Sequence, residues 1–118
     1  MPEIVLELAE INVGGWQGLR RAEIEKLEPR LATGSQSERF EVYFSSPGGE
    51  SYDAFSARIR QVLEAAQRPT VIVAHGIVGC VLRGLWLGLE RSQLAGLPGG
   101  QGCIFHLKEG REEVLWPS

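Results

Sequence analysis

The stretch V-I-V-A-H-G-I-V-G-C-V-L-R-G-L-W-L-G-L, from Val71 to Leu89, decides the fold of this chain. It opens on three β-branched residues, which are typical of a strand buried on both faces, so we expect a strand at Val71–Val73. His75 and Gly76 interrupt this run. A helix is predicted after them, because apolar residues then recur at spacings of three and four. That stripe consists of Val78, Val81, Leu82, Leu85, Trp86 and Leu89.

The placement of His75 between a strand and a helix points to ligand binding. Ligands of open α/β sheets bind at the carboxyl edge of the strands, and the free N–H groups of a helix's first turn favour an anion. His75 is therefore where we expect phosphate chemistry. The alternative is that His75 is a polar residue that merely ends a strand.

Composition limits the class of protein. The 118 residues predict one domain, residues 1–118, and the net charge of −3 makes nucleic acid a poor partner. A membrane span over residues 71–89 is disfavoured, because Arg83 near its middle would cost about 2.5–3.5 kcal/mol at a bilayer centre. Met1–Glu10 lacks the basic start of a signal peptide. Cys80 and Cys103 are expected to pack as small hydrophobes in a reduced, cytoplasmic protein, and no metal or cofactor is predicted, since no cluster has ligand spacing.

The remaining chain predicts alternating helices and strands joined by polar turns. Asp53–Gln67 is the clearest helix, with Ser51 as its N-cap, and a tight turn at Glu109–Gly110 is expected to join two hairpin strands. The other expected elements are a strand or extended lead-in at Ile4–Ile11, a short helix over Leu19–Leu27 ended by Pro29, a loop at Leu31–Glu41, weak alternation at Phe40–Phe44, and strands at Gly102–Lys108 and Glu112–Trp116. The order of elements implies an α/β layered fold.

Three stretches together resemble the histidine phosphatase superfamily, the phosphoglycerate-mutase-like fold. They are Leu8–Leu19 with its E-I-N-V-G-G-W-Q-G turn, Pro47–Ser51 followed by a helix containing Arg58, and Val73–Gly76, V-A-H-G. The resemblance implies a three-layer sheet with helices on both faces, N-terminally truncated in this chain. It also implies a small phosphate ester or inorganic phosphate as ligand. Glu10 then matches the family's general acid/base and His75 its phosphate-contacting histidine, with Asn12, Gly76 and Ile77 around the phosphate.

The sequence departs from the family pattern at the nucleophile. Family members transfer the phosphoryl group to a histidine in an Arg-His-Gly motif, which this chain lacks; its histidines are His75 and His106. The second phosphate-clamping arginine is missing too, Val13 stands where an aromatic is common, and Gln17 replaces a frequent glutamate. Phosphoryl transfer depends on neutralising the equatorial oxygens, so the chain alone is expected to be inactive. His106 is a weaker nucleophile candidate; its alternative is an exposed residue on the last strand.

The missing motif also affects the sheet. The family strand that carries it adjoins the one ending at His75, so Val71–Val73 would present an unpaired apolar edge, which we expect a homodimer or a partner chain to cover. An alternative function is therefore a non-catalytic, homodimeric phosphate-ligand binder or scaffold. A third is a small α/β interaction module in which Glu10 is a solvated strand end and Glu50 only favours a helix start. The loops Thr33–Glu38 and Ser92–Gly100 carry no signature that names a substrate.

Overall fold

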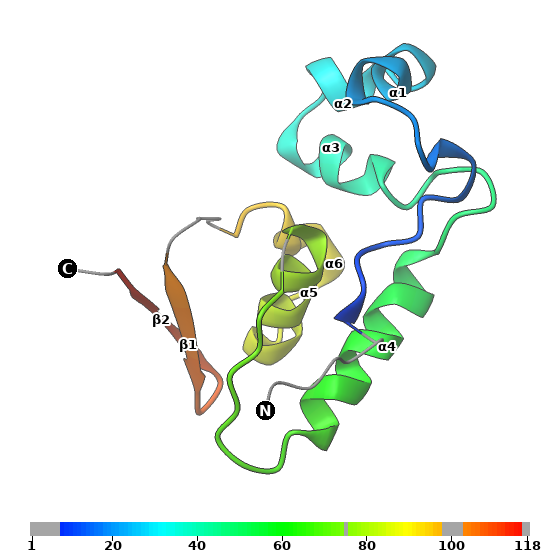
Figure 1. The fold of residues 1–118 in the computed structure, drawn as a ribbon. Helices are drawn as coiled ribbons and strands as arrows, with labels where there is room; N and C mark the ends of the chain where they lie inside the picture. Colours follow the sequence, from blue (N-terminus) through cyan, green and yellow to red (C-terminus); the bar gives the residue numbers. More distant parts are fainter. Residues whose placement is uncertain (1–7, 75, 98–102, 117–118) are drawn as a thin grey trace.

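The computed structural model describes residues 8–74, 76–97 and 103–116. About half of these residues lie in helices, and the described sheet is one antiparallel hairpin (Figure 1). In chain order the elements are η2 (Gly14–Trp16), α1 (Arg21–Leu27), α2 (Arg30–Thr33), α3 (Gln36–Val42), α4 (Tyr52–Ala65), α5 (Gly76–Leu87), α6 (Arg91–Leu94), β1 (Ile104–Lys108) and β2 (Arg111–Leu115). None of the helices within these ranges is long and apolar enough to cross a bilayer.

The two longest helices, α4 and α5, confirm the strongest sequence predictions. The Ser51 side chain accepts a hydrogen bond from the Ala54 amide at 3.1 Å, so it caps α4 as expected. Helix α5 ends at Leu87, and the next residue, Gly88, has a φ of 73°, the left-handed conformation that glycine adopts without a Cβ clash. The Leu89 amide then donates to the Gly84 carbonyl at 2.9 Å, which closes the last turn of the helix.

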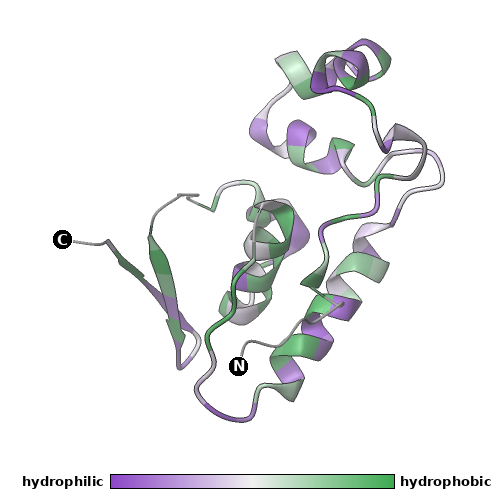
Figure 2. Ribbon diagram, in the orientation of Figure 1, coloured by the Kyte–Doolittle hydropathy of each residue, from purple (hydrophilic) through white to green (hydrophobic). Residues whose placement is uncertain are grey.

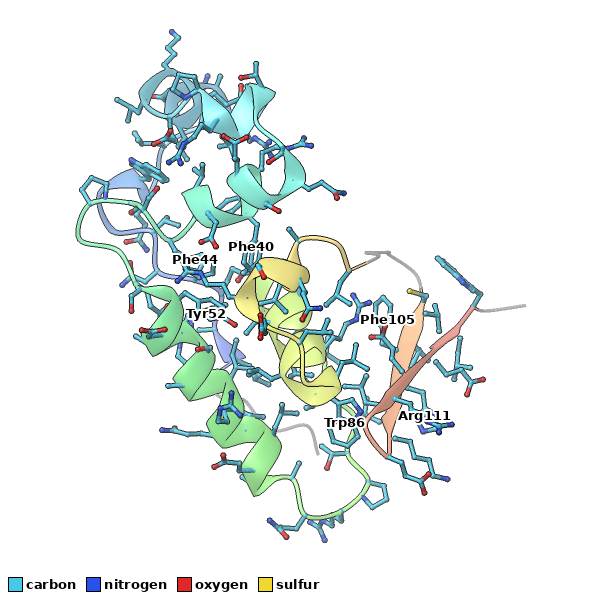
Figure 3. All side chains as sticks on the ribbon, turned by 180° about the vertical axis from the view of Figure 1, so that it is seen from behind. Phe40, Phe44, Tyr52, Trp86, Phe105 and Arg111 are labelled. Atoms are coloured by element: carbon cyan, nitrogen blue, oxygen red, sulfur yellow. The ribbon has the colours of Figure 1, made fainter. Side chains whose placement is uncertain are left out.

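The main core lies where α4, α5 and α6 meet, and Figure 2 shows α5 as apolar along most of its length. Figure 3 shows Phe40, Phe44 and Tyr52 gathered where α3 approaches α4, and the Phe44 ring contacts the Phe40 ring edge-on at 5.3 Å between centroids. The buried members of this core are Ile11, Phe40, Phe55, Ile59, Val78, Val81, Leu82 and Leu94. A smaller cluster of Trp16, Leu31 and Val42 holds α2 and α3 beside η2, so Trp16 packs in a core.

The hairpin is fastened to α5 by a buried ion pair. Glu109 and Gly110 both have positive φ, 54° and 72°, which is the turn that a two-residue hairpin favours. Arg83 forms an ion pair with Glu112, the side chains being only 7% and 13% exposed, and its guanidinium lies 3.6 Å from the centre of the Phe105 ring. Trp86 Nε1 also donates to the Arg111 carbonyl at 3.0 Å (Figure 3). The predicted hairpin is thereby confirmed.

The prediction of a strand at Val71–Val73 is wrong for this structure. The segment has no regular structure, and the exposed fractions of Val71 and Val73 are 91% and 79%. Ile72 and Ala74 pack against the main core, so side chains alternate as in a strand, but within the described ranges no strand pairs with this segment. A strand needs a neighbour to supply its hydrogen bonds, and the local sequence does not contain that neighbour.

Two further predictions need correction at the N-terminal side. For Ile4–Ile11, expected as a strand or an extended lead-in, residues 4–7 lie outside the described residues, and residues 8–11 form no strand, so the strand alternative is wrong for those four residues. The loop expected at Leu31–Glu41 and the alternation at Phe40–Phe44 are instead helices α2 and α3. The physical reason is a capping box: the Ser35 hydroxyl accepts from the Glu38 amide at 3.2 Å and the Glu38 carboxylate accepts from the Ser35 amide at 3.1 Å.

In the loop expected at Ser92–Gly100, α6 begins at Arg91, and residues 98–100 lie outside the described residues.

Candidate functional site

The Glu10 carboxylate lies against the first turn of α5. Its Oε2 accepts from the Ile77 amide at 3.1 Å and its Oε1 from the Val78 amide at 3.3 Å, while Oε1 also accepts from the Ile11 amide at 3.0 Å. The first N–H groups of a helix have no partner within the helix, and the helix dipole adds positive potential there, so a carboxylate is favoured. This contact joins residues 67 and 68 positions apart in the sequence.

Gly76 allows this approach because it has no side chain. Its φ of 56° lies in the left-handed region, and a Cβ on this residue would come within 2.5 Å of Glu10 Oε2. Any other residue type here would meet both the backbone cost of that conformation and the carboxylate. Gly76 and Ile77, expected from the sequence near a phosphate, therefore lie directly beside Glu10.

A second carboxylate, Glu50, is bound to an arginine on α4. Arg58 donates from Nε to Glu50 Oε2 at 2.8 Å and from Nη2 to Glu50 Oε1 at 3.0 Å, which is the two-pronged geometry that makes Arg–carboxylate pairs strong. Arg58 thereby holds the pKa of the Glu50 carboxyl below its ordinary value, although partial burial opposes the shift. The side chains are 20% and 15% exposed, so the pair is largely shielded from water.

The segment from Glu10 to Gly14 connects these groups to the glycine-rich loop before α4. The Asn12 amide donates to the Glu50 carboxylate, and the Asn12 carbonyl accepts from the Glu50 amide. The Asn12 side-chain Oδ1 accepts from the Gly14 amide at 2.8 Å. Gly14 approaches the loop so closely that a Cβ there would lie 2.5 Å from the Gly48 carbonyl carbon. The result is an open pocket of about 400 Å³ lined by Ala9, Glu10, Asn12, Gly48, Gly49, Glu50 and Arg58.

The structure thus brings together most of the residues that the sequence singled out. Glu10 and Asn12 line the pocket. The Ile77 amide donates to the Glu10 carboxylate, and Gly76 lies directly beside that carboxylate. His75 lies outside the described residues. His106 is exposed on β1, where it faces Glu113 of β2 and lines a different pocket on the hairpin.

Sequence reasoning missed the pairing of Glu50 with Arg58. The two residues are eight positions apart, which is not a helical contact spacing, because Glu50 precedes the N-cap of α4 and is not part of the helix. A sequence signal was nevertheless present. Arg58 lies off the apolar stripe of α4 and Glu50 lies just before the cap, so the chain can fold back to bring them together.

The chemical capacity of the pocket follows from its side chains. Glu10 can exchange a proton, Arg58 carries a positive charge, and the amides of α5 donate to an anion. Among the described residues, no group of three or more histidine, cysteine, aspartate or glutamate side chains is placed to hold a metal ion.

Comparison with known proteins defines the class. The family model of the histidine phosphatase superfamily (branch 1) matches residues 2–116, so the chain belongs to this superfamily. The chain is also similar to 6-phosphofructo-2-kinase 1 of Saccharomyces cerevisiae, with 26% identity over 112 residues. That match covers 92% of this chain and 14% of the yeast protein. No solved structure matches the chain. The resemblance seen in the motifs is confirmed, and the mixture of helices and a small sheet is compatible with an α/β fold of this family.

Proposed function

We propose that the chain binds the phosphate group of a small ester in the pocket beside the first turn of α5, and that its chemistry is phosphoryl transfer or ester hydrolysis. The observation that carries this proposal is the Glu10 carboxylate, an anion held by the Ile77 and Val78 amides at 3.1 and 3.3 Å. A phosphate oxygen is also an anion and accepts the same hydrogen bonds. Membership of the histidine phosphatase superfamily supports the assignment.

In the proposed reaction, an imidazole nitrogen attacks phosphorus and the bond from phosphorus to the ester oxygen breaks. Glu10 gives that oxygen a proton, and water then attacks the phosphoimidazole to release inorganic phosphate. His75, Gly76, Ile77 and Asn12 hold the phosphate oxygens. Because residues 1–118 contain no Arg-His-Gly motif, we expect this chain alone to be inactive or nearly so, with the attacking imidazole supplied by another polypeptide segment.

A phosphate would compete with the Glu10 carboxylate for the amides of α5. Glu10 and Glu50 together outweigh Arg58 among the described lining residues, and Glu10 already uses the amides of α5. An incoming phosphate must displace the Glu10 carboxylate to reach them. We therefore expect Glu10→Gln, which removes one negative charge, to bind inorganic phosphate several-fold more tightly than the native chain.

The alternative function is a homodimeric phosphate-ligand binder or scaffold without catalysis. The observation that favours it is the exposed edge at Val71–Ala74, where Val71 and Val73 are 91% and 79% exposed. Proteins rarely leave a β-branched extended segment open, because another strand can pair with it. A strand added there by a second copy or a partner chain would supply the hydrogen bonds that this segment lacks among the described residues.

Either function is proposed for the cytoplasm, where thiols stay reduced. Cys80 and Cys103 are both free cysteines. The Cys80 thiol donates to the Leu94 carbonyl at 3.3 Å, and burial raises its pKa, so it packs as an unreactive group between α5 and α6.

The proposal is tested by titrating the ¹⁵N-labelled chain with inorganic phosphate and by assaying hydrolysis of an aryl phosphate. We expect phosphate to shift the amide signals of Ile77 and Val78, and His75→Ala to weaken this response, with no turnover above background. No response at either amide would refute phosphate binding. Turnover abolished by both His75→Ala and Glu10→Ala would refute the expectation of inactivity and direct attention to His106.

Light scattering tests the alternative function, since a monomeric mass at micromolar concentration contradicts the homodimer.

A further inference from the structure

The backbone around Glu10 is held by the side chains of Glu50 and Arg58. Arg58 Nη2 donates to the Glu10 carbonyl at 3.3 Å, and Glu50 Oε1 accepts from the Asn12 amide at 3.2 Å. The Glu50 amide returns a hydrogen bond to the Asn12 carbonyl at 2.8 Å. The three contacts bind both ends of the short segment from which the Glu10 side chain extends.

The pair is rigid enough to fix that segment. Two parallel hydrogen bonds lock the Arg58 guanidinium to the Glu50 carboxylate, and the guanidinium also lies 4.6 Å from the centre of the buried Phe55 ring. Phe55 is fully buried in the main core. The position of Arg58 is therefore set by the packing of α4, and through Arg58 the core determines where the Glu10 backbone lies.

We propose that Glu50 and Arg58 are positioning residues, which hold the Glu10–Asn12 segment so that the Glu10 carboxylate meets the first turn of α5. This deepens the proposed function, because a general acid works only when it is held within hydrogen-bonding reach of its proton acceptor. The contact itself is a property of the ligand-free chain. It can be tested without phosphate, so failure of this inference and failure of the proposed function give different results.

The test follows the backbone amides of Ile77 and Val78 by NMR in the ligand-free protein. Glu10→Ala defines the signals of these amides without the carboxylate. We expect Glu50→Ala to move both signals most of the way toward those positions. Glu50→Gln should have a smaller effect, because its amide oxygen can still accept from Asn12. Arg58→Lys, which keeps the charge but loses the two-pronged geometry, should shift both amides in the same direction and serves if Glu50→Ala fails to fold.

Two comparisons separate positioning from a general loss of stability. Glu41→Ala removes the carboxylate of another Arg–Glu pair, Glu41 with Arg91 between α3 and α6, and should leave the Ile77 and Val78 signals unchanged. In the Glu10→Ala background, Glu50→Ala should produce no further shift at these amides, because the effect passes through the missing carboxylate. A Glu50→Ala chain that unfolds more easily but keeps native signals at both amides would overturn the inference. So would a shift that persists without Glu10.

Discussion

Replacing Gly76 with alanine should break the contact between Glu10 and α5 and leave a measurable signature. The substitution has a backbone cost of about 1–2 kcal/mol, because φ at this position is 56° and L-residues adopt the left-handed region at that cost. The new Cβ would also lie 2.5 Å from Glu10 Oε2, roughly 1 Å closer than an ordinary contact. The carboxylate must move away, and the helix loses a favourable N-terminal charge worth about 0.3–1 kcal/mol.

Gly88 provides the matched control at the other end of the same helix. Its φ is 73° and a Cβ there would meet no atom within 4 Å, so Gly88→Ala should cost only the backbone term of about 1–2 kcal/mol. Urea unfolding of the single variants, and of Gly76→Ala combined with Glu10→Ala, measures the difference. We expect the double variant to be less destabilised than the sum of its two single variants by about 0.3–1 kcal/mol. Strictly additive costs would refute the placement of Glu10 on α5.

Three further predictions concern the surrounding framework. Glu112→Gln leaves the buried Arg83 guanidinium without its charge partner and should destabilise the fold by about 3 kcal/mol in urea unfolding, and a loss below 1 kcal/mol would contradict burial of the pair. Gly84→Ala should cost about 1–3 kcal/mol because its Cβ would overlap a leucine of α6, whereas Gly79→Ala, with open space around it, should be neutral or stabilising by up to about 1 kcal/mol. The pKa of Glu50 is lowered by its arginine, so its stabilising contribution is present above the ordinary value of 4.5 and is lost as the pH falls through the lowered pKa; Glu50→Gln should flatten this acid limb in a pH series of thermal melts.

The parts of the fold that sequence could predict are those whose signals are local. Long apolar stripes in the sequence predict the helices α4 and α5, and a two-residue turn between alternating segments predicts the hairpin. The short helix α3 was missed although Ser35 and Glu38 form the S-x-x-E pattern of a capping box, because a polar, serine-containing stretch resembled a loop. In this segment the capping residues, and not the polar composition, decide the local structure.

The strand expected at Val71–Val73 failed for a different reason. Its β-branched composition is typical of a strand buried on both faces, but in the structure only Ile72 packs against the core and both valines are exposed. Whether such a segment becomes a strand depends on a neighbour that supplies hydrogen bonds, which no local pattern specifies. For the site, the resemblance singled out Glu10, whose role stays a prediction, whereas only the folded chain reveals that Glu50 and Arg58 meet beside it.

The geometry also suggests how one side chain can serve two states of the proposed site. Without ligand, Glu10 satisfies N–H groups at the start of α5 that have no partner within the helix. A bound phosphate would take over those hydrogen bonds and release the carboxylate. Because Arg58 and Glu50 still hold the backbone at Glu10 and Asn12, the released side chain can only rotate about a fixed Cα and stays beside the phosphate. In the proposed reaction a general acid acts at that place, so the hold of Arg58 and Glu50 on the backbone would couple phosphate binding to placement of the acid.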